Sequence, residues 1–560
     1  MGVAKKRVTF VYRNYEGLGI AYIASYVRSL GHDVQLVLYP DPWSDTYIKQ
    51  KDKETPMTGR LQHRVNRQLH SEVRAFAPDL ICFSTVTDDY RWCLAEAAAL
   101  KEVTGGALTI FGGVHVTSVP ERVLHRPEVD FLGLGEGERT VGALLEHLDD
   151  WRAGEDLKIP GLWYVRDGRV VQSGWGEAVQ DLDTLPFPAK DLFYARLPGL
   201  ARTYSITSSR GCPYACTYCY NAVMLPKYRE QGKWMRQRSV DGVIAELTWA
   251  RKHFNPRHVL FHDDVFASNT KWVEEFAPRY RREIGLPFGL VTEVIVLKED
   301  VVRQLKEAGL VNVQVGVQTL NDESKRRIDR PESKAQTEHA FAALNKYGVH
   351  YQVDHMLGIP GETDADQRDA VTFYNTFRPD IVSVFWLKYY PKLPIIDFAI
   401  EKGILKRDDL EDIEEGRNEA SYIFGGNAPD FRKWLGYNMI FGWLNFLPRR
   451  VVDFLLVGNR IEWVAWESFF FSQSVPRLLS VITRRPDFRG RDHLRRLRGQ
   501  LVYILKLAWR DWRARGDGGG PGALPAPAIF DGRQPVRGVL VGRRSGGRVV
   551  AVGGPGNVER

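Results

Sequence analysis

Three cysteines lie close together in the segment RGCPYACTYCYN, residues 210–221. Cys212, Cys216 and Cys219 have the spacing C-x3-C-x2-C, and they directly follow a strand-like run, Thr203 to Ser208. Thiolate is the usual protein ligand of a [4Fe–4S] cluster, which has four irons. Three cysteines therefore leave one iron of such a cluster open to a ligand from outside the protein.

Two other interpretations of these cysteines are open. A structural zinc ion needs a fourth ligand, and the nearest histidines, His253 and His258, are far along the chain. The alternative is three buried thiols without a metal. Five cysteines in 560 residues do not suit a secreted disulfide scaffold, so we expect a reducing compartment. We interpret the other two cysteines, Cys82 and Cys93, as structural.

The cysteine motif, with an aromatic residue before its last cysteine, resembles that of the radical S-adenosylmethionine (SAM) enzymes. The resemblance implies that Cys212, Cys216 and Cys219 bind a [4Fe–4S] cluster and that SAM chelates the open iron. It also implies that Tyr218 lies against the adenine of SAM. The partner that this chemistry requires is an external electron donor of the flavodoxin or ferredoxin type.

Three later segments resemble the same family, each at the end of a predicted strand. The first is acidic and would receive the SAM amino group, the second would bond the ribose, and the third is a turn near the adenine. The alternative for each segment is a purely local role in a tight turn or a helix cap. The residues concerned are Asp263, Asp264, Gln318, Gly358, Pro360 and Glu362.

The first 150 residues alternate β-branched runs with helical stretches, which is typical of a parallel sheet covered by helices. Such a sheet binds ligands at the carboxyl ends of its strands. Glycines in the loops there let the backbone approach a planar or phosphate-bearing ligand. The candidate ligand-binding residues in these loops are Glu16, Gly19, Ser84, Thr85, Gly112, Gly113, His115, Gly135 and Glu136.

These loops, followed by a radical SAM domain, resemble the cobalamin-binding radical SAM enzymes over residues 5 to about 400. Cobalamin domains often carry Asp-x-His-x-x-Gly after the first strand, whereas this chain has Asn14-x-Glu16-x-x-Gly19. The resemblance therefore implies cobalamin without a protein histidine on cobalt, and His115 beside the corrin or its tail. A domain that binds no corrinoid is the alternative.

The pattern along the chain predicts an α/β protein with five parts. The turn dipeptide Asp167-Gly168 predicts a hairpin in the second part, and six strand candidates predict a partial (β/α)6 barrel in the third. The parts are a doubly wound, Rossmann-like cobalamin-binding domain (1–150), a connector (151–200), the radical SAM barrel (201–400), a helical, aromatic and basic region (401–515), and a Gly/Pro-rich tail (516–560). We expect the tail to be disordered, with a weak hairpin over 539–552.

The resemblance implies methylation of an unactivated carbon of a small-molecule or lipid-like substrate, through a 5′-deoxyadenosyl radical and methylcobalamin. One alternative is a cyclase or rearrangement enzyme that uses the same cofactors without methyl transfer. Another is a cobalamin-binding regulatory protein. The sequence contains no convincing acid–base pair, so we assign no catalytic side chain.

Charge and hydropathy limit the partners. The net charge is 77 − 69 = +8, and without a nucleic-acid-binding motif we expect no nucleic-acid partner. No signal peptide or spanning segment is evident, which predicts a cytoplasmic protein. Aromatic residues followed by an arginine-rich run, residues 434–498, fit an aromatic core with a solvated basic face. They also fit a cover over the active site, a hydrophobic substrate site or a contact with an anionic membrane.

Overall fold

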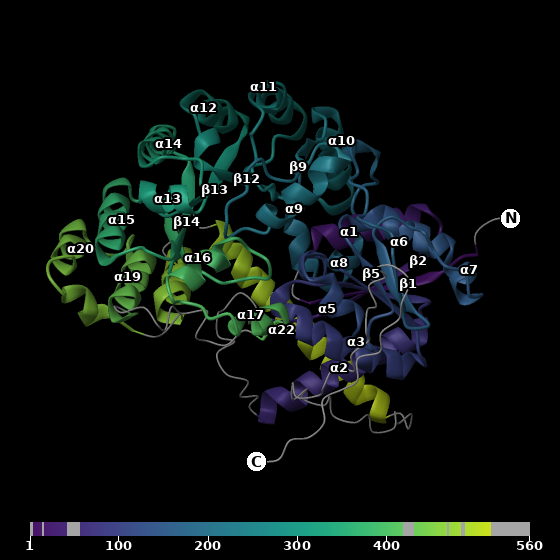
Figure 1. Ribbon diagram of the computed structural model, residues 1–560. Helices are drawn as coiled ribbons and strands as arrows, with labels where there is room; N and C mark the ends of the chain where they lie inside the picture. Colours follow the sequence, from purple (N-terminus) through teal and green to yellow (C-terminus); the bar gives the residue numbers. More distant parts are fainter. Residues whose placement is uncertain are drawn as a thin grey trace, which may run out of the picture.

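The computed structural model describes residues 4–13, 16–41, 56–417, 431–466, 470–482 and 488–516. Two sheets, each flanked by helices, lie side by side in the molecule (Figure 1). The first has seven strands in the order β2-β1-β3-β4-β5-β6-β7, and the second has six in the order β15-β14-β13-β12-β11-β8. The predicted α/β class is confirmed.

The first five strands of the seven-stranded sheet are parallel, as predicted for the N-terminal domain. A hairpin extends this sheet antiparallel to β5, and its turn residues Asp167 and Gly168 both have positive φ (51° and 72°). A two-residue I′ turn requires this conformation. The strands are β1 (Arg7–Arg13), β2 (Asp33–Tyr39), β3 (Leu80–Ser84), β4 (Leu108–Gly112), β5 (Phe131–Gly133), β6 (Leu162–Arg166) and β7 (Arg169–Gln172). The main helices are α1 (Leu18–Ser29), α2 (Pro56–Phe76), α3 (Tyr90–Thr104) and α6 (Gly137–Glu146).

All six strands of the second sheet are parallel, and β8 and β15 form its two edges, so the barrel is partial as predicted. The strands are β8 (Thr203–Ile206), β11 (His258–Phe261), β12 (Phe288–Glu293), β13 (Leu310–Gln318), β14 (His350–Leu357) and β15 (Ile381–Trp386). The helices between them are α9 (Asn221–Tyr228), α10 (Val240–Phe254), α11 (Thr270–Arg279), α12 (Glu299–Ala308), α13 (Asp322–Arg327), α14 (Lys334–Lys346) and α15 (Asp364–Phe377).

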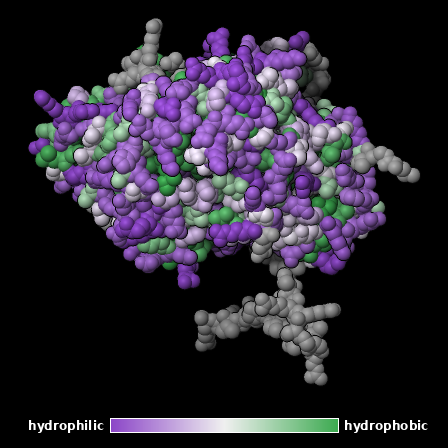
Figure 2. All heavy atoms as spheres, turned by 90° about the horizontal axis from the view of Figure 1, so that it is seen from above, coloured by the Kyte–Doolittle hydropathy of each residue, from purple (hydrophilic) through white to green (hydrophobic). Residues whose placement is uncertain are grey.

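Local sequence explains where several of these helices begin and end. The Ser239 side chain accepts a hydrogen bond from the Gly242 amide at the start of α10, and Asn255 ends that helix at φ 49°. Ser333 and Gln336 form a capping box at the start of α14. Valines of the strands, such as Val313 in β13, are fully buried against these helices. The side of the molecule that carries α11, α12 and α14 is mostly hydrophilic (Figure 2).

The C-terminal region is helical, as predicted. Part of its aromatic block is core, since Trp434 and Phe441 are buried in the core of the second sheet, but Trp463 and Trp466 are exposed. The long helix α22 returns to the N-terminal half and lies beside α2 (Figure 1). The helices are α16 (Ile395–Glu401), α17 (Asp409–Glu414), α19 (Phe431–Trp443), α20 (Arg449–Leu455), α21 (Val475–Ile482) and α22 (Phe488–Gly516).

Residues 517–560, with the hairpin predicted over 539–552, lie outside the described residues. Within the described part of the chain, every helix is too short or too polar to cross a lipid bilayer. The domain boundaries given above stay predictions.

Candidate functional site

The three cysteines lie on the loop between β8 and α9, at the carboxyl end of the second sheet. Backbone hydrogen bonds fix this loop: the Cys219 amide donates to the Cys216 carbonyl at 2.8 Å, and the Thr217 amide donates to Ile328 at 3.1 Å. Burial raises the pKa of Cys212 to about 12 and of Cys216 to about 11. Both are therefore thiols without a metal, and iron must displace their protons.

This donor set fits a cluster. Its three thiols come from one loop, with Cys212 and Cys216 buried and Cys219 half-buried. Among the residues described, no three His, Cys, Asp or Glu are arranged to hold a single metal ion. In a [4Fe–4S] cluster each cysteine binds a different iron, so its ligands do not have to converge on one point.

Ion pairs join the cysteine loop to the N-terminal domain. Arg210, two residues before Cys212, donates to Glu138 at 2.6 Å and lies 3.4 Å from Glu136. Arg236 donates to the other oxygen of Glu136 at 2.6 Å. Burial alone would raise the pKa of Glu136, but these two guanidinium groups hold it below its usual range. Glu136 thus joins the two domains through ion pairs, and the cofactor contact that we predicted for it stays a prediction.

The two predicted acidic residues after β11 differ in their surroundings. Asp263 is buried and accepts hydrogen bonds from the Ser208 amide (3.0 Å) and from the hydroxyls of Ser208 (2.8 Å) and Ser209 (2.5 Å). It holds the start of the cysteine loop, which is a different role from the predicted one. Asp264 is accessible, with the Asn221 amide 3.3 Å away, and desolvation still raises its pKa. We therefore expect Asp264 to receive the SAM amino group.

A buried arginine, Arg330, which we did not predict from the sequence, holds several parts of this site together. Arg330 donates to Glu293 at the end of β12 (2.9 Å), to the Gly316 carbonyl in β13 (2.6 Å) and to the Tyr218 hydroxyl (3.2 Å). It also donates to buried Glu332 at 3.0 Å. Arg330 thus connects the cysteine loop to two strand ends and fixes the predicted adenine-contacting Tyr218.

Gln318 lies at the last position of β13 with φ 64°, in the left-handed region. The pairing of β13 with β14 shifts register at the same place. A non-glycine residue there costs roughly 1–2 kcal/mol, and such strain concentrates at functional sites. This geometry supports Gln318 as a contact of the SAM ribose, which stays a prediction.

Replacing Gln318 by glycine should separate stability from binding. Gln318→Gly removes the backbone strain and the side-chain amide together. We expect its unfolding temperature to stay the same or rise, and the KM for SAM to rise several-fold. Gln318→Ala is the control, because it loses the amide but keeps the strain. A lower unfolding temperature of Gln318→Gly with an unchanged KM would contradict this assignment.

The predicted turn after β14 is present, and Gly358 and Gly361 have positive φ (88° and 84°). Pro360 is buried within it. Glu362 binds the Thr319 hydroxyl, and the Gln367 amide donates to it at 3.0 Å. The carboxyl group therefore joins the loops after β13 and β14.

Burial raises the pKa of Glu362 from 4.5 to about 8. The contribution of the protonated side chain to stability is complete below pH 4.5 and is lost as the pH rises through about 8. Glu362→Gln cannot ionise, so we expect its free energy of unfolding to fall less over this range, by up to about 1.4 kcal/mol per pH unit. Urea unfolding from pH 5.5 to 8.5 measures this. Exposed Glu338→Gln is the control, and parallel curves for wild type and Glu362→Gln would refute the assignment.

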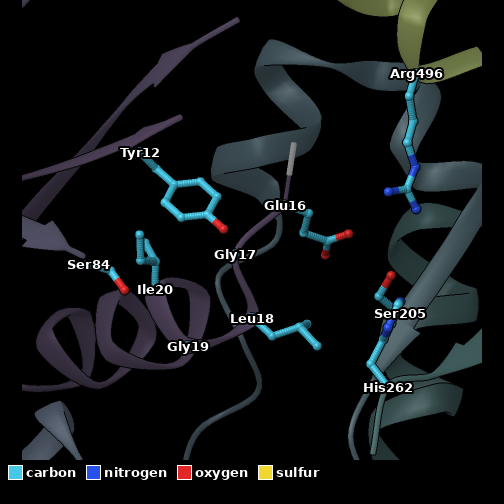
Figure 3. A pocket seen from close by; sticks show the side chains of 10 residues that line it. All are labelled: Tyr12, Glu16, Gly17, Leu18, Gly19, Ile20, Ser84, Ser205, His262 and Arg496. Atoms are coloured by element: carbon cyan, nitrogen blue, oxygen red, sulfur yellow. The ribbon is translucent and has the colours of Figure 1, made fainter. Parts of the chain in front are cut away.

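A cavity of about 280 Å³ lies between the carboxyl end of the first sheet and the second sheet. Figure 3 shows Tyr12 and Ser84 on one side and Ser205, His262 and Arg496 of α22 on the other. Three predicted residues, Glu16, Gly19 and Ser84, meet here, whereas the sequence analysis missed the contributions of Tyr12, Ser205, His262 and Arg496.

Two of the lining residues define how the cavity accepts a ligand. The Glu16 carboxylate forms an ion pair with Lys190, which is fully buried. Among the described residues, and apart from the backbone of its own helix, no atom lies within 4 Å of the position that a Cβ would take at Gly19. Gly19 therefore leaves its backbone open to a ligand, and Lys190 fixes Glu16 beside it.

The other predicted residues of the N-terminal domain are not among those that line the cavity. His115 is buried, its Nδ1 is 3.0 Å from the Thr87 hydroxyl and its ring lies 4.1 Å from that of Tyr90, and burial lowers its pKa to about 4. The His115 ring thus packs inside the domain, and its contact with the corrin stays a prediction. A Cβ on Gly113 would lie 2.7 Å from the Thr85 backbone, so this glycine lets two loops cross. The Gly112 carbonyl accepts a hydrogen bond from the Thr85 amide at 2.8 Å. A Cβ on Gly135 would clash with the Tyr228 hydroxyl.

Two family models match the chain in the predicted order. The B12 binding domain matches residues 6–145, and the radical SAM superfamily matches residues 206–374. The chain belongs to the radical SAM enzymes that carry a B12-binding domain. The cofactors of this enzyme are therefore a [4Fe–4S] cluster, SAM and cobalamin, as predicted. The cavity lies at the carboxyl end of the B12-binding sheet, where such a sheet binds its ligand, and the cysteine loop fits the cluster.

Several known proteins are similar to this B12-binding radical SAM enzyme. An uncharacterized methyltransferase of Pyrococcus horikoshii is 25% identical, over 69% of this chain and 79% of its own length. An anaerobic magnesium-protoporphyrin IX monomethyl ester cyclase of Rubrivivax gelatinosus is 23% identical, over 71% of this chain and 70% of its own length. The hopanoid C-3 methylase of Methylococcus capsulatus is also 23% identical, over 68% of this chain and 68% of its own length.

The same fold occurs in the cobalamin-dependent S-adenosylmethionine radical enzyme OxsB, solved with aqua-cobalamin and S-adenosylmethionine bound. Its TM-score is 0.61 at 15% identity, and the match covers 92% of this chain and 81% of OxsB.

Proposed function

We propose that this enzyme transfers a methyl group from SAM to a carbon atom of an apolar, lipid-like small molecule. The observation that carries the proposal is the pairing of Arg210 with Glu136 and Glu138. These ion pairs join the loop of Cys212 to the carboxyl end of the B12-binding sheet, which supports cofactor sites that face one another.

Together, the bound cofactors supply a 5′-deoxyadenosyl radical and a transferable methyl group. The protein has to position the reactants and exclude water. Arg330 fixes Tyr218 within the cysteine loop, and the buried pair of Lys190 with Glu16 fixes one wall of the cavity. Among the relatives, the hopanoid methylase is named for a lipid-like substrate, which supports the same class here.

Cyclisation without methyl transfer is the second candidate, because a cyclase is among the similar proteins at nearly equal identity. The electron donor is expected to be of the flavodoxin or ferredoxin type. The cytoplasmic location stays a prediction, and five unpaired thiols suit a reducing compartment.

Labelled SAM separates the two candidates. The reconstituted enzyme, a chemical reductant and S-adenosyl-[methyl-14C]methionine are incubated anaerobically with a total bacterial lipid extract. We expect label in the organic phase together with 5′-deoxyadenosine. Formation of 5′-deoxyadenosine that depends on the extract, without label in any product, would overturn methyl transfer in favour of cyclisation.

A further inference from the structure

The outer face of α22 carries a continuous apolar stripe. Leu505, Trp509 and Trp512 are 64%, 54% and 62% exposed, and Leu501 and Val502 beside them are exposed as well. At 100° per residue these five positions fall within about one third of the helix circumference. Exposed apolar residues of a folded protein are normally scattered, and a contiguous patch marks an interaction surface.

The opposite face of α22 is fixed to the protein. Tyr503 and Leu507 are buried in the core of the N-terminal domain. Asp511 forms two hydrogen bonds with Arg67 of α2, at 3.1 and 3.0 Å. The helix therefore cannot rotate to bury its apolar stripe, and any partner must approach along the helix side.

Positive charge accompanies the stripe. Arg498, Lys506 and Arg513 are exposed on or beside it, and the Arg513 guanidinium lies 5.5 Å from the Trp509 ring. Between residues 494 and 514 the one acidic residue is Asp511, which is buried in its pair with Arg67. Tryptophan and leucine flanked by Lys and Arg are typical of helices that lie in the interface of an anionic bilayer.

We propose that this stripe, Leu501 to Arg513, docks the enzyme on the surface of an anionic lipid bilayer. A second copy of the chain is a poor occupant, because pairing two such helices would bring like charges together. Residues 517–560 are also a poor occupant, because they contain six arginines and three acidic residues and so carry charge of the same sign as the stripe. Anionic lipid headgroups supply the opposite charge, and the acyl region takes up the apolar side chains. This proposal does not depend on methyl transfer.

Vesicle co-sedimentation of the full-length holoprotein tests the proposal. We expect binding to phosphatidylcholine vesicles with 30% phosphatidylglycerol, and at least about tenfold weaker binding to phosphatidylcholine alone. Trp509→Ala with Trp512→Ala, and separately Lys506→Glu with Arg513→Glu, should each weaken binding at least about tenfold. Trp463→Ala with Trp466→Ala removes another exposed tryptophan pair and is the matched control.

All these side chains are exposed, so the unfolding temperature and SAM cleavage in the absence of lipid should match the wild type. Equal binding to both kinds of vesicle would overturn the proposal. So would unchanged binding of the Trp509 and Trp512 variant, or loss of binding in the control alone. If the wild type is a dimer and the Trp509 and Trp512 variant is a monomer, the stripe is instead the interface with a second copy of the chain.

Discussion

Cys216→Ala is expected to reduce 5′-deoxyadenosine formation to background while cobalamin binding stays unchanged. Cys216 is one of three thiols for the cluster, and without a third thiolate a second iron lacks a protein ligand. The predicted corrinoid contacts Glu16, Gly19 and Ser84 line the cavity, and Cys216 is not among the residues that line it. Iron content, 5′-deoxyadenosine and corrinoid absorbance of the anaerobically reconstituted protein measure the three effects.

Cys82→Ala is the matched control for that experiment. Cys82 is an unpaired thiol in β3, buried in the N-terminal core, and its loss should leave iron content and SAM cleavage unchanged. Normal iron content in Cys216→Ala would contradict the assignment of the cluster. Loss of both cofactors would show that the two sites are not separable.

Arg330→Ala is expected to lower the free energy of unfolding by about 3–5 kcal/mol, which is typical when one partner of a buried ion pair is removed. The arginine is nearly inaccessible, and its loss leaves the carboxylates of Glu293 and Glu332 facing each other without a cation. Tyr218 loses its hydrogen bond at the same time, so SAM should bind more weakly. Urea unfolding and the KM for SAM measure the two effects.

Arg326→Ala removes an exposed arginine of α13 nearby and should leave both values unchanged. Arg330→Lys keeps a positive charge but cannot make the six hydrogen bonds that the guanidinium group donates, so we expect a partial recovery of stability. A loss below about 1 kcal/mol in Arg330→Ala would show that the cluster of charges is not a stabilising element.

Most of the parallel strands were predictable because they are short apolar runs rich in β-branched residues and largely buried. The strand-like run Thr203 to Ser208 begins at the residue where β8 begins in the structure, and β8 ends two residues earlier, at Ile206. The antiparallel pairing of β6 with β5 was not predicted, since the local pattern shows a hairpin but not the edge that it joins. The return of α22 to α2 likewise depends on a contact between Arg67 and Asp511, far apart in sequence.

The cysteine loop was predictable because its three ligands fall in one short segment. Arg330 was not, since its partners Glu293 and Tyr218 are 37 and 112 residues away and form no motif. Glu136 looked like a ligand-loop residue because it lies in a glycine-rich turn. Its partners Arg210 and Arg236 come from the other domain, which a local pattern does not show.

The central claim is that Cys212, Cys216 and Cys219 hold a cluster with one iron open to SAM. Low-temperature electron paramagnetic resonance of the anaerobically reconstituted, reduced protein tests it most directly. We predict the signal of a reduced [4Fe–4S] cluster that changes on addition of SAM. A signal that SAM leaves unchanged, or zinc in place of iron at these cysteines, would contradict the claim.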